Sequence, residues 1–288
     1  MFFKDVVKMI EKANKISFQG ELGAYSHQAC AAVFPNAEAV ACKTFESAIA
    51  TVKRGGADLA MLPVENSTYG RVADIHYLLP ESGLHIIGEH FERVHINLMG
   101  VQGANIEDIT SAKSHTVLLG QCRKFLNEYD MLPVTGVDTA GSAKEVAAAG
   151  DASQGALAGD LAAEIYGLTV LARHIEDNKN NTTRFLVMSP EPTFEPQSKE
   201  ELITTFVFRV RNIPAALYKA MGGFATNGVN MVKLESYMIG GSFTATQFYA
   251  DIVGHPNDEP VQRALEELGY FTTHLEVLGV YKADQSRG

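Results

Sequence analysis

Between residue 16 and about residue 190, short apolar runs alternate with alanine-rich segments, and this alternation constrains the fold more than any other feature. The apolar runs have the length and composition of buried strands, whereas the segments between them have helical spacing. Strands that alternate with helices form a parallel α/β sheet with helices on its faces. The predicted strands are 16–19, 57–62, 84–100, 133–137, 155–159, 169–176 and 184–189, and the predicted helices include 45–54, 71–79, 117–129, 141–149 and 160–166.

Length, composition and charge exclude several classes of protein. The chain has 288 residues, of which 46% are hydrophobic, and this length favours two domains over one. No run approaches the ~20 apolar residues of a membrane span, and residues 1–5 carry a lysine and an aspartate where a signal peptide would be apolar. We therefore expect a cytoplasmic protein. The formal charge of −10, without basic runs, argues against a nucleic-acid or anionic-membrane partner.

The three cysteines indicate neither disulfides nor a metal site. Cys30, Cys42 and Cys122 are odd in number and lack the spacing of zinc ligands. We expect them to be small buried hydrophobic side chains.

A segment rich in proline and glutamate marks a domain boundary. Residues 190–200 contain three prolines and three glutamates, which is the composition of a stiff linker. The pattern after it has the ferredoxin-like order βαββαβ, and its exposed edge strands favour pairing into a homodimer or homotetramer. The predicted elements are 203–210, 214–226, 229–238, 245–253, 258–268 and 274–281, with a hairpin turn at 240–242.

Three polar loops next to predicted strands suit an anionic small molecule. Residues 177–185, Asp-Asn-Lys-Asn-Asn-Thr-Thr-Arg-Phe, would bring amides, hydroxyls and a guanidinium to the rim of a sheet, where ligands of open α/β sheets bind. Residues 20–26 and 65–70 each join a strand to a helix, and a helix start leaves free N–H groups for an anion. Each loop, taken alone, could also be an ordinary turn or cap.

These loops carry a family resemblance. Four motifs occur in the order and spacing of prephenate dehydratases: Gly20-x-x-Gly23-Ala24-Tyr25-Ser26, Pro63-Val64-Glu65-Asn66-Ser67, Asp138-Thr139-Ala140-Gly141 and Asn181-Thr182-Thr183-Arg184-Phe185. The residues after about 203 resemble the ACT regulatory domain that usually follows. The resemblance covers nearly the whole chain and implies an α/β fold, with a two-lobed, type II periplasmic-binding-protein-like catalytic domain and a βαββαβ ACT domain.

The resemblance also implies boundaries. The chain would cross between the two lobes twice in extended segments, which explains the length of the apolar run 84–100. Two-lobed clefts allow hinge closure around a ligand. The implied ranges are 15–190 for the catalytic domain, about 16–92 and 175–190 for one lobe, about 93–174 for the other, 191–201 for the linker and 202–283 for the ACT domain.

The family reaction converts prephenate to phenylpyruvate with loss of carbon dioxide and of the ring hydroxyl. Each of these losses places a demand on the active site. Hydroxide is a poor leaving group, so a side chain must donate a hydrogen bond or a proton to it. The departing carboxylate should be poorly solvated, whereas the pyruvyl carboxylate does not react and can be clamped. Aromatisation supplies the driving force, so we expect no cofactor and no metal.

By resemblance, Thr183 lies at the leaving hydroxyl, Arg184 clamps a carboxylate and Phe185 forms a wall of the site. A threonine hydroxyl is a very weak acid, so Glu65 and His115 are the ionisable groups that could support it as a proton source. The alternatives are a turn hydroxyl for Thr183, a salt-bridge partner for Arg184 and a core side chain for Phe185.

The other motifs imply further contacts with the substrate. Asn66 and Ser67 could bind it or cap a helix, Tyr25 could instead be packing, and Thr139 or Ser142 could cap the helix that follows them. Around Ser114 and Gln121 the chain departs from the family pattern, because relatives commonly carry proline and glutamine within 116–119. The implied contacts are Asn66, Gly23, Ala24, Tyr25, Ser26, Ser67, Ser114, Gln121, Thr139, Ala140 and Phe185.

The ACT resemblance implies that L-phenylalanine binds between paired domains and inhibits the enzyme. The family's effector motifs usually read glycine-alanine-leucine and glutamate-serine-arginine-proline. This chain has alanine at 215 and Tyr237-Met238 in place of the arginine and proline, so the identity and strength of the effector stay open. The implied effector contacts are Ala215, Ala216, Leu217, Asn230, Glu235 and Ser236.

Two other functions fit the same pattern. An arogenate dehydratase performs this elimination on the amino-acid analogue and gives phenylalanine, and kinetics on both substrates would separate the two enzymes. A non-catalytic two-lobed sensor would hold a small molecule and report it through the ACT domain. Loss of turnover in Thr183→Ala would distinguish an enzyme from such a sensor.

Overall fold

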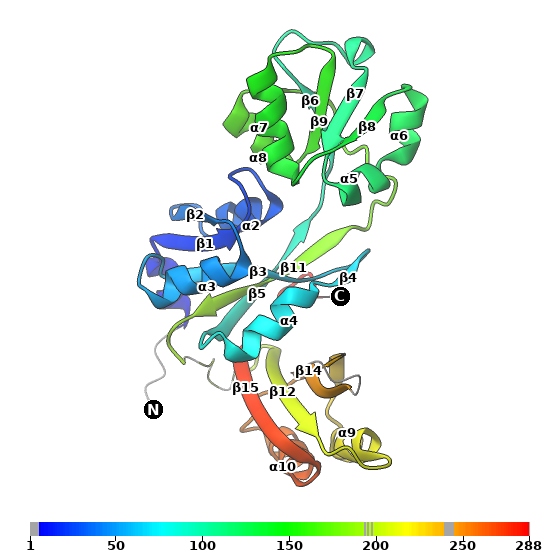
Figure 1. The fold of residues 1–288 in the computed structure, drawn as a ribbon. Coiled ribbons are helices and arrows are strands. Elements are labelled where there is room, and N and C mark those ends of the chain that lie inside the picture. Colours follow the sequence, from blue (N-terminus) through cyan, green and yellow to red (C-terminus); the bar gives the residue numbers. More distant parts are fainter. Residues whose placement is uncertain (1–5, 193, 195, 197, 239–244, 288) are drawn as a thin grey trace.

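The computed structural model describes residues 6–192, 194, 196, 198–238 and 245–287 and places them in three units (Figure 1). A second lobe lies at the top of the view, a first lobe in the middle and a C-terminal unit at the bottom. The first lobe and the C-terminal unit share a ten-stranded sheet, whereas the second lobe has a five-stranded sheet. The predicted fold class, a two-lobed type II α/β unit followed by a ferredoxin-like βαββαβ unit, is confirmed. None of the described helices is long and apolar enough to cross a membrane.

The first lobe is built around strands that are buried on both faces. Leu59, Ala60, Met61 and Leu62 of its central strand are at most 2% exposed, which explains the continuous apolar run there. The strand order is β2-β1-β3-β11-β5, with β1 parallel to both neighbours and β11 antiparallel to both of its own. The elements are α1 (Val6–Lys12), β1 (Lys15–Gln19), α2 (Tyr25–Val33), β2 (Glu38–Cys42), α3 (Phe45–Lys53), β3 (Leu59–Asn66), β4 (Gly70–Arg71), α4 (Ala73–Leu78), β5 (His85–Arg93) and β11 (Thr182–Ser189).

The second lobe has the strand order β10-β6-β9-β7-β8. Strand β7 is parallel to β8 and β9, and β6 is antiparallel to β9 and β10. The elements are β6 (Asn97–Gly100), β7 (Ser111–Ser114), α5 (Thr116–Gln121), α6 (Arg123–Glu128), β8 (Leu132–Thr135), α7 (Thr139–Ala149), β9 (Gln154–Ala158), α8 (Asp160–Tyr166) and β10 (Thr169–Ala172).

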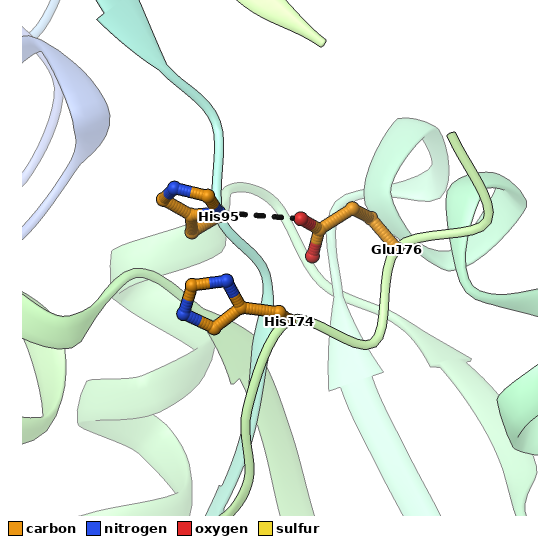
Figure 2. Close-up of side chains that lie close together, drawn as sticks. All are labelled: His95, His174 and Glu176. Carbon is orange, nitrogen blue, oxygen red and sulfur yellow. Dashed lines mark hydrogen bonds and ion pairs between the residues drawn. The ribbon is translucent and has the colours of Figure 1, made fainter. Parts of the chain in front are cut away.

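The chain crosses between the lobes twice, through residues 94–96 and 173–181, and we call these two segments the hinge. The apolar run 84–100 is therefore two strands, because β5 ends at Arg93 and β6 begins at Asn97. The crossings run side by side, since the N–H of Ile175 donates to the carbonyl of Ile96 at 2.9 Å. Figure 2 shows one crossing at His95 and the other at His174 and Glu176.

Some elements differ from the predictions. Strands β2 and β7, with the sequences Glu-Ala-Val-Ala-Cys and Ser-Ala-Lys-Ser, were not predicted, because such short, alanine-rich or polar sequences have low strand propensity. The helix predicted at 117–129 is two helices, α5 and α6, which meet at Cys122. The backbone of Cys122, with φ −119° and ψ 23°, is not helical, and it breaks the run.

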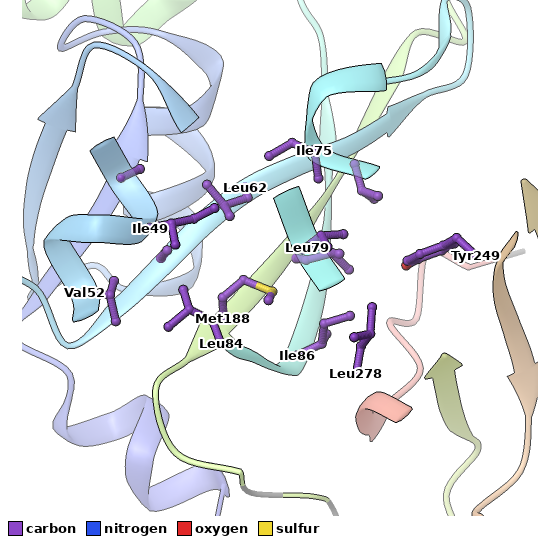
Figure 3. Packing of buried hydrophobic residues seen from close by; sticks show 14 of the residues in the cluster. Ile49, Val52, Leu62, Ile75, Leu79, Leu84, Ile86, Met188, Tyr249 and Leu278 are labelled. Carbon is purple, nitrogen blue, oxygen red and sulfur yellow. The ribbon is translucent and has the colours of Figure 1, made fainter. Parts of the chain in front are cut away.

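The C-terminal unit packs against the first lobe through β15, which lies beside β5 with Gly279 opposite Ile86. A Cβ at Gly279 would lie 2.2 Å from the Ile86 carbonyl oxygen, so the close approach requires glycine. One hydrophobic cluster spans the junction, with Leu79 and Ile86 on one side and Tyr249 and Leu278 on the other (Figure 3). The elements are β12 (Leu202–Val210), α9 (Ala216–Thr226), β13 (Met231–Met238), β14 (Ala245–Val253), α10 (Glu259–Phe271) and β15 (Thr272–Lys282); the turn predicted at 240–242 lies outside the described residues.

Candidate functional site

Thr183 belongs to a chain of side chains that joins the two lobes. It lies at the start of β11, directly opposite Asn66 at the end of β3. The Asn66 amide Nδ2 donates to Thr183 Oγ1 at 3.0 Å and to Asn181 Oδ1 at 2.7 Å. Asn181 Nδ2 in turn donates to Oε1 of Gln121, from α5 of the second lobe, at 3.1 Å. The structure thus brings together the predicted residues Asn66, Gln121 and Thr183.

The orientation of the Asn66 amide determines what the threonine hydroxyl can do. Asn66 Oδ1 accepts from the backbone N–H groups of Thr68 and Tyr69 at 2.9 and 3.0 Å, so its NH₂ group must face Thr183. Thr183 therefore accepts a hydrogen bond through its oxygen. Within the described part of the chain no group accepts its proton, which leaves the half-buried hydroxyl able to donate to a ligand.

Ser67 fixes the loop after β3 to the second crossing. Its hydroxyl donates to the carbonyl of Asn180 at 2.7 Å and accepts from the N–H of Thr182 at 2.9 Å. This hydroxyl thus both donates and accepts a hydrogen bond to hold the segment that precedes Thr183.

Arg184 does not turn toward Thr183, and its contacts match the alternative of a salt-bridge partner. Successive side chains of a strand point to opposite faces, and the face of Arg184 is covered by the C-terminal unit. Its side chain is 2% exposed, and the guanidinium donates to Glu89 at 2.7 Å, Glu65 at 2.8 Å, Asp251 at 2.7 Å and the Tyr281 hydroxyl at 2.8 Å. The cation is committed to an ion network between the two units.

Glu65 belongs to this ion network too, and its carboxylate binds cations of the network rather than Thr183. It lies opposite Arg184 in the sheet register and binds both Arg184 and Lys233. Burial raises the pKa of Glu65, but the hydrogen bonds and charges of Lys233 and Arg184 outweigh burial and hold its pKa below the usual range. His115, the other candidate acid, accepts from the N–H of Val117 and caps α5.

Two ionisable groups that the sequence did not reveal lie on the face of the sheet that carries Thr183. Glu92 of β5 is directly opposite Thr183, and His90 is opposite Phe185, so these side chains share one face. Glu92 Oε1 accepts from Gln28 Nε2 of α2 at 2.7 Å, and its Oε2 lies 2.9 Å from His90 Nε2. No motif signals this pair, because only the β5–β11 register makes them neighbours of Thr183.

The glycine turn at 20–24 contacts the second lobe. Gly23 has a φ of +90°, and a Cβ there would lie 2.9 Å from Cα of Ala162. The carbonyl of Leu22 accepts from the Tyr166 hydroxyl at 2.7 Å. Tyr25 donates its hydroxyl to the carbonyl of His95 in the hinge at 2.7 Å, and burial raises its pKa well above the usual value. Ala24 caps α2 without a side-chain hydrogen bond, and Ser26 is buried.

The structure also places the four remaining predicted substrate contacts, Ser114, Thr139, Ala140 and Phe185. Ser114 is fully buried and donates to the carbonyl of Leu157 at 2.7 Å, within the second sheet. Asp138, rather than Thr139 or Ser142, caps α7 by accepting from the N–H of Gly141 at 2.6 Å; Thr139 is half-buried and Ala140 is fully buried. Phe185 is 1% exposed in the core of the first lobe, which matches the alternative of a core side chain.

The predicted effector residues divide between two places. Ala215, Ala216 and Leu217 form the start of α9, where Ala215 has a φ of +61° in the region that favours glycine. On β13, Glu235 pairs with Lys233 at 3.2 Å and the Ser236 carbonyl accepts from Arg71 of the first lobe at 2.6 Å. The carbonyl of Asn230 accepts from Val253 within the unit.

Comparison with known proteins gives concordant matches. The sequence model of the family described as "Prephenate dehydratase" matches residues 16–193. A "Bifunctional N-acyl-homoserine lactone acylase/prephenate dehydratase" of Komagataeibacter europaeus is 49% identical over 272 residues, which cover 94% of this chain and 97% of that protein. An "Arogenate dehydratase/prephenate dehydratase 2, chloroplastic" of Arabidopsis thaliana is 37% identical over 279 residues, covering 94% of this chain and 73% of that protein.

Solved structures agree with these matches. The structure titled "GqqA- a novel type of quorum quenching acylases" has a TM-score of 0.90 and 48% identity, covering 96% of this chain and all of that chain. The prephenate dehydratase from Arthrobacter aurescens, titled as a complex with L-Phe, has a TM-score of 0.85 and 29% identity, covering 93% of this chain and 90% of that chain.

Proposed function

Because the chain belongs to the prephenate dehydratase family, we propose that it catalyses the decarboxylative dehydration of prephenate to phenylpyruvate, a step of L-phenylalanine biosynthesis. The observation that carries the proposal is the 3.0 Å hydrogen bond from Asn66 to the Thr183 oxygen. This bond leaves the Thr183 proton available for a ligand. A hydroxyl held in this way suits donation to the leaving hydroxyl of prephenate.

The reaction breaks two bonds of the substrate. The bond between the ring and its carboxylate breaks, and the electron pair moves into the ring. The bond to the hydroxyl then breaks with its own electron pair, and the ring becomes aromatic. Hydroxide leaves as water once it takes up a proton. Thr183 would stabilise the charge that develops on the departing oxygen, and Glu92 with His90, on the same face of the sheet, would deliver the proton in place of Glu65 and His115.

We propose that Arg184 does not bind the substrate carboxylates, because its guanidinium is already paired with Glu89 and Asp251. We propose the starts of α2 and α7 instead, since free N–H groups at a helix N-terminus attract anions. The predicted contacts Tyr25, Thr139 and Ala140 lie at these two starts. At α7 the Asp138 carboxylate already binds the N–H of Gly141, so only the N–H groups of Thr139 and Ala140 are proposed for the ligand.

The C-terminal unit would act as an ACT-type regulatory domain that responds to L-phenylalanine. Support comes from its βαββαβ order and from the relative solved with L-Phe. Glu235 binds Lys233, Lys233 binds Glu65, and Glu65 binds Arg184, which follows Thr183 in β11. A movement of β13 on effector binding would therefore be transmitted through these ion pairs to β11, the strand that carries Thr183. The exposed side chains of Val232 and Leu234 on this edge strand support a homodimer or homotetramer.

Two alternatives have a specific observation in their favour. The Arabidopsis relative is named for both arogenate and prephenate, which keeps arogenate as a candidate substrate. The relative at 49% identity is named as an acylase as well as a dehydratase, which makes hydrolysis of N-acyl-homoserine lactones a second candidate activity.

Kinetics of the pure protein test these functions together. Prephenate, arogenate and an N-acyl-homoserine lactone are supplied separately, and phenylpyruvate, phenylalanine and the released fatty acid are quantified by mass spectrometry, with and without L-phenylalanine. We expect turnover of prephenate that L-phenylalanine changes. Turnover of the lactone with none of prephenate or arogenate would overturn the dehydratase proposal, and binding of prephenate without turnover would favour a sensor.

A further inference from the structure

The hinge contains a cluster of two histidines and a carboxylate that the dehydratase chemistry does not use. His95 comes from the first crossing, and His174 and Glu176 come from the second (Figure 2). One possible ligand atom from each of the three lies within 4.8 Å of the other two. His95 Nδ1 is 3.3 Å from Glu176 Oε1, and the centres of the two imidazole rings are 4.1 Å apart.

From this cluster we infer that His95, His174 and Glu176 form a binding site for a divalent transition metal ion of the zinc class. Two imidazoles and one carboxylate are a ligand set that binds Zn²⁺ and its neighbours. Ligands at about 2.1 Å from one tetrahedral ion lie about 3.4 Å apart, so the cluster would need to contract only through small side-chain rotations.

The surroundings of the carboxylate favour a ligand role. The Glu176 side chain is 2% exposed, and its Oε2 accepts from the N–H of Ile96 at 3.0 Å. This bond fixes the carboxylate and turns Oε1 toward the histidines, as outer-shell hydrogen bonds do for metal ligands. Solvent reaches the site through His174, which is exposed, so an ion has a path of entry.

The backbone of His174 gives an independent observation. Its φ of +56° lies in the left-handed region, which is unfavourable for a residue with a Cβ. The N–H of His174 donates to Asn97 Oδ1 at 3.1 Å, so this conformation is held in place. Strained residues of this kind concentrate at functional sites, and here the strain directs an imidazole toward its counterpart on the other crossing.

A metal ion here would join the two crossings. The two crossings are held together by hydrogen bonds, including the backbone bond from Ile175 to Ile96 and the bond from Ile96 to the Glu176 carboxylate. An ion bound to residues 95, 174 and 176 would further restrict changes of angle between the lobes. The proposed elimination needs no metal ion, so this site is independent of the proposed catalytic function.

Metal titration tests the inference directly. The purified full chain, stripped with a chelator, is titrated with Zn²⁺ alone in competition with a chromophoric chelator, and Co²⁺ is added separately for its visible absorption. We expect one tight site per chain and a Co²⁺ spectrum with nitrogen and oxygen ligands and no thiolate charge-transfer band. Protection of the Ile96 and Ile175 amides from hydrogen exchange should increase on addition of Zn²⁺.

Three variants identify the ligands. His174→Asn removes the imidazole while asparagine tolerates the left-handed backbone, and Glu176→Gln removes the charge; each should weaken Zn²⁺ binding at least about tenfold. His274→Asn is the matched control, because His274 forms a similar pair with Glu276 at 3.3 Å in the C-terminal unit. Equal Zn²⁺ affinity in the wild type and in His174→Asn, with both folded by circular dichroism, would overturn the site.

Discussion

Arg184→Met tests whether this arginine is a structural cation or a substrate clamp. The side chains of Glu89 and Asp251 are 0% exposed, and the guanidinium binds each at 2.7 Å. Its removal leaves both buried carboxylates to share Arg287, which lies 2.8 and 3.2 Å from them. Removing one partner of a buried ion pair costs about 3–5 kcal/mol, and because Arg287 compensates in part we expect about 3 kcal/mol.

The loss should depend on pH with a sign set by Asp251. Burial raises the pKa of Asp251, but the charge of Arg184 and the hydrogen bond from Thr205 outweigh burial and hold its pKa below the usual range. In the wild type this carboxylate contributes stability that is present above its unfolded-state pKa and is lost as the pH falls through its folded-state pKa. Without Arg184, burial raises the pKa of Asp251. In mild acid this carboxylate is then protonated in the variant, which removes the cost of a buried charge without its main partner. The difference in stability should therefore shrink from pH 7 to about pH 5.

Urea unfolding followed by circular dichroism at both pH values measures this difference. Arg184→Lys, which keeps the charge but loses the planar fork, should lose less stability than Arg184→Met. The KM for prephenate is measured on the same samples. A free energy of unfolding within about 1 kcal/mol of wild type, together with a KM raised about 100-fold, would refute the structural role and restore the clamp.

Four further substitutions probe other parts of the structure. Gly279→Ala should cost at least about 2 kcal/mol, because its Cβ would lie 2.2 Å from the Ile86 carbonyl oxygen; an unchanged melting temperature would contradict this close approach. Ala215→Gly should stabilise the chain by about 1 kcal/mol, since φ is +61° at this position; a lower midpoint of urea unfolding would count against it. Glu92→Gln should lower kcat on prephenate about 100-fold or more, whereas Glu65→Gln, on the opposite face, should mainly reduce stability; the reverse pattern would return the acid role to Glu65.

The pattern of apolar residues could predict those strands whose own sequence shows that they are buried. The run ending at Leu62 is apolar throughout because β3 is covered on both faces. Strand β7, Ser-Ala-Lys-Ser, forms because β8 and β9 pair with it on both sides, and that pairing has no local signal. The break between Arg93 and Asn97 was also invisible to periodicity, since residues 94–96 stay apolar at positions 94 and 96 while they pass between lobes.

The motifs could identify site residues but not the direction of each side chain. Thr183 and Asn66 face each other because the register of β3 and β11 pairs them, and the same register turns Arg184 toward the C-terminal unit. The sequence alone could not show which face of β11 that unit would cover. The hinge cluster escaped prediction for a related reason, because His95 and Glu176 are 81 residues apart in the sequence.

The effect of Thr183→Val on kcat tests the central claim most directly, because valine keeps the shape of the side chain and removes only the hydroxyl that Asn66 orients. The account predicts that kcat on prephenate falls by about 10²–10⁴, with an unchanged melting temperature, and that Thr183→Ser stays within about tenfold of wild type. A valine variant whose kcat stays within about threefold of wild type would contradict the assignment of this hydroxyl to the leaving group.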